Sequence, residues 1–378
     1  MSAPYLLLNP PYTRLCGYTR GKAATVFVQF LSLSSQFHTM VNAIFTTPEP
    51  GTVVKPIYQY SEEQQTHIKA LREYADSLLL DPLDPYHKWE LRWLNKLDTM
   101  PRYMRAAKWK LPDAKRRIEE TIKWRREFQP ELIRPDEVKI EAETGKILLN
   151  GFDKDGRPII YMRPGRENTE TSPRQLRHLV WWLERAKDLM PPGQESLVII
   201  VDYKSTTLRT NPSISVASKV LTILQQHYVE TLGRAIVTNL PMLLNFFYKG
   251  ISPFLDPVTR DKMRFNPDLL DLIPKSQLDS DFGGDFDFEF DHETYWKQIV
   301  EFCGIAEDGT RLEGYFDGPK NIQHAERPSQ QSDADTEPGT ASPTSTSSTT
   351  VSVTSAGETK ALASPEVTLA TPELIEAS

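Results

Sequence analysis

The chain has 378 residues, a net charge of −7 at pH 7 and a pI near 5.6, which argues against nucleic acid as a general partner. Its two cysteines, Cys16 and Cys303, cannot form a disulfide framework, and no run of about 20 apolar residues predicts a membrane-spanning helix. The length suits one large domain or two modest ones.

Residues 1–60 carry few signals of a folded domain. The first 48 residues contain no Asp or Glu and are rich in Ser, Thr and aromatic residues. Three interpretations compete: a mitochondrial presequence, a poorly ordered terminal extension, and a misassigned start with Met40 as the true first residue. The last two are favoured together. We therefore expect residues 1–60 to be a poorly ordered extension.

Residues 61–130 read as a small helical subdomain. Ser61 followed by Gln64 three residues later is a capping box that predicts a helix start. The segment 113–128 places Ala114, Ile118 and Ile122 on one face and Lys, Arg and Glu on the other. Its basic run is interpreted as a solvated face, with attraction to a membrane surface as the alternative.

Residues 131–305 change to an α/β pattern. A continuous β-branched run at 197–201 predicts a strand buried on both faces, and a helix separates it from the next strand, which indicates a parallel βαβ unit with a right-handed crossover. The predicted strands are 146–150, 158–163, 197–201, 235–239 and the short 263–265, and the longer predicted helices are 172–189 and 213–228. Residues 306–378, which become rich in Ser, Thr and Pro, are expected to be a disordered tail.

The stretch from Pro241 to Phe265 stands out. Its first half is almost wholly apolar, and Pro253 is expected to end that helix. Asp256 and Pro257 then predict the start of a second helix, on which Thr259 and Lys262 share a face. An apolar element beside a Thr/Lys pair at a positive helix end suits a lipid with its phosphate. The alternative is an ordinary core helix followed by an ordinary cap.

Motifs of catalysis are not found. The sequence has no G-x-S-x-G, phosphate-loop, H-E-x-x-H or C-x-x-C pattern. Asp202 ends the buried strand, where active-site acids often lie, but an ion pair with Lys204 explains it equally well. We therefore predict no catalytic residue, no metal site and no cofactor.

A set of motifs in chain order resembles one family. They are the segments 103–109, 124–126, 155–158, 201–204, 227–234, 239–241, 253–259 and 282–284. Together they resemble the CRAL-TRIO lipid-binding fold, and within it the fungal phosphatidylinositol transfer proteins, over residues of about 60–305. The resemblance implies a helical subdomain packed on a mostly parallel sheet, with an apolar pocket for lipid tails. It also implies a gating helix, represented here by Phe246, Phe247, Ile251, Phe254 and Leu255.

The family's inositol-lipid site carries over to four positions. Lys262 and Thr259 match residues that hold the phosphate and headgroup, Glu230 matches the acid that pairs with the lysine, and Lys108 matches a basic residue of the helical subdomain. Without the resemblance, each would be read as a surface charge or helix cap. Ala107 departs from the family, because an arginine often precedes the matching lysine.

The resemblance has a second departure, which concerns choline lipids. Members of the family bind phosphatidylcholine through hydroxyl residues on the buried strand, where this chain has Leu197 and Ile199. We expect a non-enzymatic monomer with phosphatidylinositol as bound ligand and an unidentified second lipid, such as a sterol. It would transfer phosphatidylinositol between membranes and present it to inositol-lipid kinases. The expected location is the cytoplasm, with visits to the endoplasmic reticulum, lipid droplets or plasma membrane. The rival is a scaffold that holds a sterol or another lipid without exchanging it.

Overall fold

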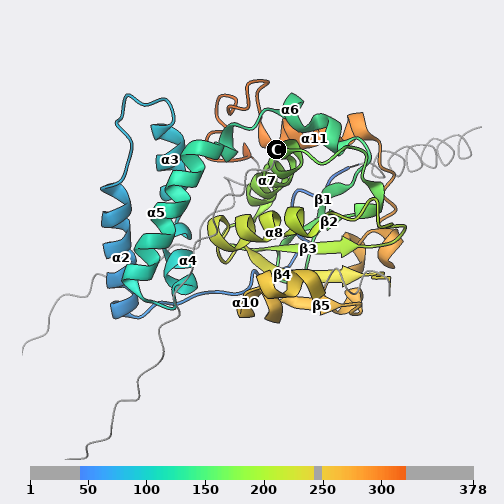
Figure 1. Cartoon of the computed structure of the whole chain (residues 1–378), viewed down its shortest axis with the longest axis horizontal. Coiled ribbons are helices and arrows are strands. Elements are labelled where there is room, and N and C mark those ends of the chain that lie inside the picture. Colours follow the sequence, from blue (N-terminus) through green and yellow to red (C-terminus); the bar gives the residue numbers. More distant parts are fainter. Residues whose placement is uncertain (1–42, 242–248, 321–378) are drawn as a thin grey trace, which may run out of the picture. The chain divides into compact units, whose positions relative to one another are not determined.

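A run of helices precedes a segment of strands and helices in the part of the chain that the computed structural model describes, residues 43–241 and 249–320 (Figure 1). The α-helices are Glu62–Asp76 (α2), His87–Leu94 (α3), Thr99–Ala106 (α4), Leu111–Phe128 (α5), Pro135–Ala142 (α6), Pro173–Leu189 (α7), Ile214–Thr222 (α8), Pro257–Asp261 (α10) and His292–Cys303 (α11). The strands are Ile147–Phe152 (β1), Pro158–Met162 (β2), Leu197–Asp202 (β3), Leu232–Thr238 (β4) and Met263–Phe265 (β5). Shorter helical turns are Pro130–Leu132 (η1), Pro164–Arg166 (η2), Ile223–His227 (η3), Ser252–Phe254 (η5), Leu269–Asp271 (η6), Lys275–Gln277 (η7) and Ser280–Phe282 (η8). Within the described ranges, no helix is long and apolar enough to span a bilayer.

The helical subdomain packs through the faces that the sequence pattern predicts. Ser61 and Gln64 form the expected capping box at the start of α2. Helix α5 buries Ala114, Ile118 and Ile122 in a cluster with side chains of α2, α3 and α4, and Figure 1 shows α2, α4 and α5 side by side. This core also takes in Val229, which follows η3 in the sequence. The subdomain and the sheet lobe therefore share buried contacts.

The lobe is built on one sheet with strand order β1-β2-β3-β4-β5 among the described residues. Strands β1 and β2 form an antiparallel hairpin through the predicted turn at 153–156, and the pairs β2–β3, β3–β4 and β4–β5 are parallel. Helix α7 packs against β1 and β2, while α6 and α11 pack against α7. The predicted α/β architecture with a mostly parallel sheet is confirmed.

Two expected domain boundaries differ from the structure. Residues 43–60, predicted as part of a poorly ordered extension, cross the lobe: Phe45 N–H donates to Asn150 Oδ1 at 2.9 Å, and the Phe45 ring lies 4.5 Å from that of Phe286. Past residue 305, the Arg311 guanidinium forms a buried ion pair with Asp188 at 2.7 Å. Single aromatic anchors and ion pairs leave little trace in composition, so the sequence pattern missed both. Residues 1–42 and 321–378 lie outside the described ranges.

Candidate ligand-binding site

A cavity of about 550 Å³ lies along strands β3 and β4. Strand register explains its floor. Ile199 pairs with Ala235, which pairs with Met263, and these three side chains line the cavity as one row across the sheet. Val201 and Val237 form the next row on the same face, because side chains two residues apart on a strand point the same way. The remaining aliphatic lining is Ala106, Met162, Val220, Leu221, Leu224, Val229, Leu232, Leu240, Ile251, Leu255, Pro257 and Val258.

The two positions where the family carries hydroxyl residues differ in their placement. Ile199 forms part of the cavity floor and is 4% exposed. Leu197 is buried, but it is not among the residues that line the cavity. Both side chains are apolar, so neither can hydrogen-bond a polar headgroup, and the cavity floor is an apolar surface suited to hydrocarbon.

The four predicted headgroup residues all line this same cavity. Lys108 follows α4, Glu230 lies between η3 and β4, and Thr259 and Lys262 lie in and just after α10. The Lys262 Nζ atom is 3.5 Å from Glu230 Oε2, and both side chains are about one-fifth to one-quarter exposed. The cavity therefore combines an apolar floor with a charged mouth, built from the helical subdomain and the lobe.

Lys108 and Glu230 have left-handed backbone conformations that residues other than glycine rarely adopt. Lys108 has φ 50° and Glu230 has φ 57°. Such left-handed residues cost roughly 1–2 kcal/mol each, so they persist where surrounding contacts fix them. At Lys108, backbone hydrogen bonds close the end of α4, from Lys108 N to Arg105 O and from Trp109 N to Met104 O, both at 2.8 Å.

Thr259 is placed as predicted, but its hydroxyl is already engaged. Asp256 caps α10: its Oδ1 accepts from Thr259 N at 2.9 Å, and its Oδ2 accepts from the Thr259 hydroxyl at 2.6 Å. The predicted cap at Asp256 is confirmed. We expected the positive end of this helix to face a phosphate. The Asp256 carboxylate instead accepts the hydrogen bonds available there and places its own negative charge at the helix end.

Sequence reasoning missed other polar residues at the mouth. Asp256, Arg116, Arg117 and Glu120 also line the cavity. Arg116 and Glu120 form an exposed i,i+4 pair at 3.1 Å, which suits the interpretation of a solvated face for this helix. Arg117 lies on the same helix, which begins three residues after Lys108, and this position was the available sequence signal.

The predicted gating residues fall into two groups. Phe246 and Phe247 lie outside the described residues. Ile251 and Leu255 line the cavity, whereas Phe254 is 47% exposed and does not. Residues 249–251 are helical and pass into η5 at Ser252, next to Pro253. The α-helical conformation therefore ends at Ile251, two residues before the predicted stop at Pro253, while residues 242–248 of the predicted helix lie outside the described residues.

Neither of two buried groups with nucleophilic side chains, one at the cavity wall and one in α11 outside the cavity lining, is activated by its surroundings. Burial raises the pKa of Tyr203, at the cavity wall, to about 12, and burial raises the pKa of the Cys303 thiol to about 12. Neither group is thereby prepared as a nucleophile near neutral pH. In residues 43–241 and 249–320, no cluster of His, Cys, Asp and Glu has the arrangement of a metal site.

Comparisons with known proteins place this architecture in a family. The family model described as CRAL/TRIO domain matches residues 142–284. A CRAL-TRIO domain-containing protein of Schizosaccharomyces pombe is 45% identical over 69% of this chain and 27% of its own length. The phosphatidylinositol transfer protein PDR17 of Saccharomyces cerevisiae is 36% identical over 64% of this chain and 76% of its own. The SEC14 cytosolic factor of Kluyveromyces lactis is 29% identical over 59% of this chain and 78% of its own.

The relatives differ in how much of them this chain represents. It spans 27% of the Schizosaccharomyces pombe relative but 76% of PDR17. Among solved structures, the crystal structure of Sfh5 aligns with a TM-score of 0.45 and 17% identity, over 65% of this chain and 98% of that one.

Proposed function

Because this chain belongs to the CRAL-TRIO family of lipid-binding and lipid-transfer proteins, we propose that it binds phosphatidylinositol and transfers it between membranes. The observation that carries the proposal is the convergence of Lys108, Glu230, Thr259 and Lys262 on the mouth of one apolar cavity. PDR17, which shares 36% identity, bears the name of a phosphatidylinositol transfer protein.

The division of the cavity into an apolar floor and a charged mouth suits an amphiphilic ligand. Burying each CH₂ group of an acyl tail against the apolar lining is favourable by about 0.8 kcal/mol. A phosphodiester that leaves water needs cations and donors at the same place, and Lys108 and Lys262 supply two ammonium groups. The ligand would thus lie with its tails along β3 and β4 and its phosphate at the mouth.

Glu230 supports an inositol headgroup over a choline headgroup. An ionised carboxylate only accepts hydrogen bonds, and the inositol ring offers several hydroxyl donors whereas choline offers none. The pairing of Glu230 with Lys262 orients the carboxylate at the mouth. Since Ile199 and Leu197 offer no hydroxyl, the second lipid in this proposal is one without a choline requirement, such as a sterol.

Exchange requires that the cavity open at a membrane. Phe254 lies next to the cavity-lining Leu255, and Val258 lines the cavity itself. Both side chains are exposed, at 47% and 46%, and offer apolar contact with a bilayer. In this proposal the protein is a cytoplasmic, non-enzymatic monomer that visits membranes such as the endoplasmic reticulum, lipid droplets or plasma membrane. It releases the lipid there to inositol-lipid kinases.

The test compares two site variants with a matched control. Lys262→Ala and Glu230→Lys should each abolish transfer of labelled phosphatidylinositol between vesicles while leaving thermal unfolding unchanged. Lys275→Ala removes an exposed lysine that pairs with Asp285 outside the cavity lining, and it should transfer normally. Normal transfer by both site variants would overturn the site assignment.

Mass spectrometry of bound lipids distinguishes the alternative. After incubation with vesicles of mixed phospholipids and sterol, the proposal expects about one phosphatidylinositol per protein and little phosphatidylcholine. A sterol or other lipid that stays bound through repeated vesicle exchange would instead indicate a non-exchanging scaffold. The apolar floor formed by Ile199 and Val201 is the observation that keeps this alternative open, because it fits either ligand.

A further inference from the structure

The turn that carries Glu230 lies in the lobe but is held by the helical subdomain. The segment 226–231 comprises the last two residues of η3 and the connection to β4, and Glu230 adopts its left-handed conformation near the end of this segment. Within the lobe, Thr231 N donates to Tyr228 O at 3.0 Å and Leu197 N to Thr231 O at 2.8 Å. These bonds close the turn and join it to β3. On either side of Glu230, the Thr231 hydroxyl donates to Val229 O only at 3.5 Å, so both oxygens can still accept from elsewhere.

Arg102 of helix α4 donates hydrogen bonds to both of these oxygens. Its Nη1 donates to Val229 O at 3.1 Å and to Thr231 Oγ1 at 3.0 Å, so one guanidinium nitrogen bridges the two neighbours of Glu230. Arg102 is 2% exposed. On its other side, Arg102 Nε lies 2.7 Å from Asp98 Oδ2. Although burial acts to raise the pKa of Asp98, Arg102, Lys187 and Lys96 lower it, so the carboxylate stays ionised.

Other side chains of the helical subdomain hold the approach to the turn. The Thr121 hydroxyl donates to Gln226 O at 3.0 Å, and the Trp124 ring stacks on His227 at 4.4 Å. The Tyr228 hydroxyl donates to Glu184 of α7 at 2.7 Å, and Arg125 of α5 lies 3.1 Å from the same carboxylate oxygen. The segment from Gln226 to Thr231 therefore contacts the helical subdomain along its length.

We propose that Arg102 is a positioning residue for the headgroup site, because it fixes the turn that presents Glu230 to Lys262. The inference rests on the proposed function and extends it. Helix α4 ends at Ala106, and Lys108 follows two residues later, so one helix positions both the basic residue and the acid at the cavity mouth. Headgroup binding and docking of α4 onto the lobe are then linked, and each strengthens the other.

The test uses Arg102→Lys, which keeps the charge beside Asp98 but loses the planar fork of donors. Loss of hydrogen bonds from a charged group at this turn should weaken phosphatidylinositol binding by about tenfold. Binding of a pyrene-labelled diacylglycerol, which has tails but no phosphate or inositol, should stay unchanged. Arg92→Lys is the control, because Arg92 is a buried arginine of the helical subdomain that contacts Asp188 and Phe316 but neither the turn nor the cavity.

A double-mutant cycle with Glu230→Gln separates positioning from general structural support. If Arg102 acts through Glu230, Arg102→Lys should have little further effect on phosphatidylinositol binding once Glu230 is replaced. Additive losses, or equal losses for the diacylglycerol probe, would overturn the inference. Thr231→Val removes the hydroxyl that accepts from Arg102, together with its long bond to Val229 O, at nearly constant volume, and should give about a threefold loss. If Arg102→Lys unfolds at the assay temperature, Thr231→Val replaces it in the double-mutant cycle with Glu230→Gln.

The outcomes also separate this inference from the proposed function. If Glu230→Gln alone leaves phosphatidylinositol binding unchanged, the headgroup site itself is wrong, and the role assigned to Arg102 falls with it. If Glu230→Gln weakens binding but both Arg102→Lys and Thr231→Val bind normally, the site stands and the positioning role is refuted.

Discussion

The Asp256 carboxylate shares the cavity mouth with the two lysines that are proposed to bind a phosphate. It caps α10 and accepts the hydroxyl hydrogen of Thr259. Replacing Asp256 by Asn keeps a good capping side chain but removes a negative charge near the ligand. It also frees the Thr259 hydroxyl to donate. We expect phosphatidylinositol binding to strengthen by about fivefold, corresponding to roughly 1 kcal/mol.

Equilibrium binding to vesicles measures this effect, and Asp291→Asn is the control. Asp291 caps α11 in the same way, through Thr294 N at 2.9 Å, but does not line the cavity. Its replacement should leave binding unchanged. Weaker binding by Asp256→Asn, with α10 intact, would mean that the carboxylate contributes to the headgroup site and does not oppose it.

His227 should make stability depend on pH. Burial, assisted by Arg125, lowers the pKa of His227 from 6.5 to about 4. The folded protein therefore binds fewer protons than the unfolded chain between these values. This contribution to stability is complete above pH 6.5 and is lost as the pH falls towards 4. After allowance for partial exposure, we expect a loss of about 1–2 kcal/mol.

The variant His227→Phe isolates that contribution. Phe retains the stacking on Trp124 but cannot take up a proton. Urea unfolding at pH 7 and pH 4.5 should show a smaller drop for the variant than for the parent protein. The neutral His178, which accepts from Trp182 Nε1 at 2.8 Å, is common to both proteins and cancels in the comparison. An identical drop in both proteins would show that His227 does not titrate in this range.

Residue roles were predictable only where a motif marks them. Lys108, Glu230, Thr259 and Lys262 were proposed from the family resemblance, and the structure brings them to one cavity. Arg102 had no such signal. It lies on a helix in another subdomain, 127 residues before Val229, and acts through backbone and hydroxyl groups that a sequence pattern does not display.

At the scale of elements, hydrophobic patterns located the sheet well. The run 197–201 became β3, and the three residues 263–265 became β5 as predicted. The helix predicted over 213–228 was not continuous: α8 ends at Thr222, and the π-type turn η3 follows. One π-type turn adds a single residue to the helical repeat and barely changes the spacing of the apolar residues. The hydrophobic periodicity of the sequence therefore could not reveal η3. The contacts made by residues 226–231 are a tertiary reason for that turn.

The turn at Gly283 and Gly284 offers a matched pair of substitutions. A Cβ added to Gly284 would lie 1.7 Å from the Leu278 carbonyl oxygen, so the backbone would have to move. A Cβ on Gly283 meets no atom within 4 Å, and only its φ of +87° is unfavourable. We expect Gly284→Ala to lower the free energy of unfolding by on the order of 3 kcal/mol or more. Gly283→Ala should cost only about 1 kcal/mol.

Chemical denaturation of both variants measures the difference. The closing segment after this turn returns to the core through Phe286, whose N–H donates to Leu278 O at 3.2 Å. The loss of this hydrogen bond should accompany the larger destabilisation expected for Gly284→Ala. Equal costs for the two variants would mean that the turn relaxes around Gly284 more easily than its close approach to Leu278 implies.

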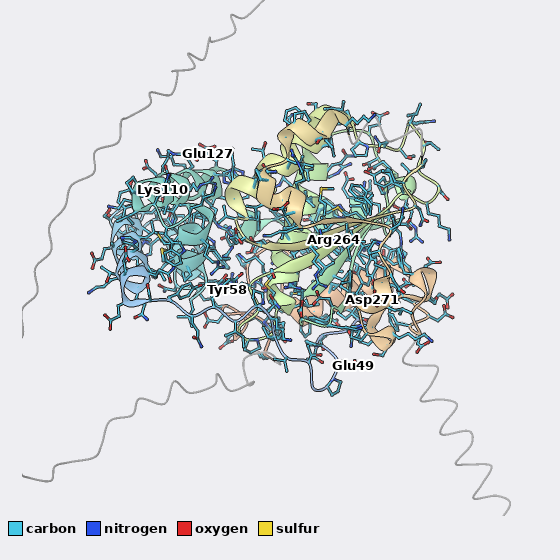
Figure 2. The ribbon with its side chains drawn as sticks, turned by 90° about the horizontal axis from the view of Figure 1, so that it is seen from below. Glu49, Tyr58, Lys110, Glu127, Arg264 and Asp271 are labelled. Atoms are coloured by element: carbon cyan, nitrogen blue, oxygen red, sulfur yellow. The ribbon has the colours of Figure 1, made fainter. Side chains whose placement is uncertain are left out.

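At the scale of the whole described unit, residues 43–60 connect the lobe to the helical subdomain. Phe45 anchors one end against Phe286. At the other end, the Tyr58 ring lies 3.7 Å beneath the Arg105 guanidinium, and Tyr60 packs on Trp109 at 5.5 Å. Figure 2 shows Tyr58 where the helical subdomain meets the lobe. These contacts fall on both sides of Lys108, so this segment, the strap, helps to fix a headgroup residue from outside the predicted domain.

Removal of the strap should therefore affect both stability and binding. The experiment would compare a chain that begins at residue 43 with one that begins at residue 61, so that residues 1–42 are absent from both. Loss of the half-buried Phe45 side chain and of the Arg105–Tyr58 contact should lower the free energy of unfolding by about 2 kcal/mol, after the entropy of ordering the strap is subtracted. Denaturant unfolding measures this, and phosphatidylinositol binding should weaken in parallel.

Two single substitutions in the full chain separate these effects. Phe45→Ala removes the anchor on the lobe and should reduce stability while leaving phosphatidylinositol binding unchanged. Tyr58→Ala removes the contact beside Lys108 and should weaken binding severalfold at a smaller cost in stability, because Tyr58 is already 38% exposed. If Phe45→Ala impairs binding as strongly as Tyr58→Ala, the strap acts only by stabilising the fold. If the two truncated chains are equally stable, the contacts of residues 43–60 contribute nothing measurable, and 61 is the functional start of the domain after all.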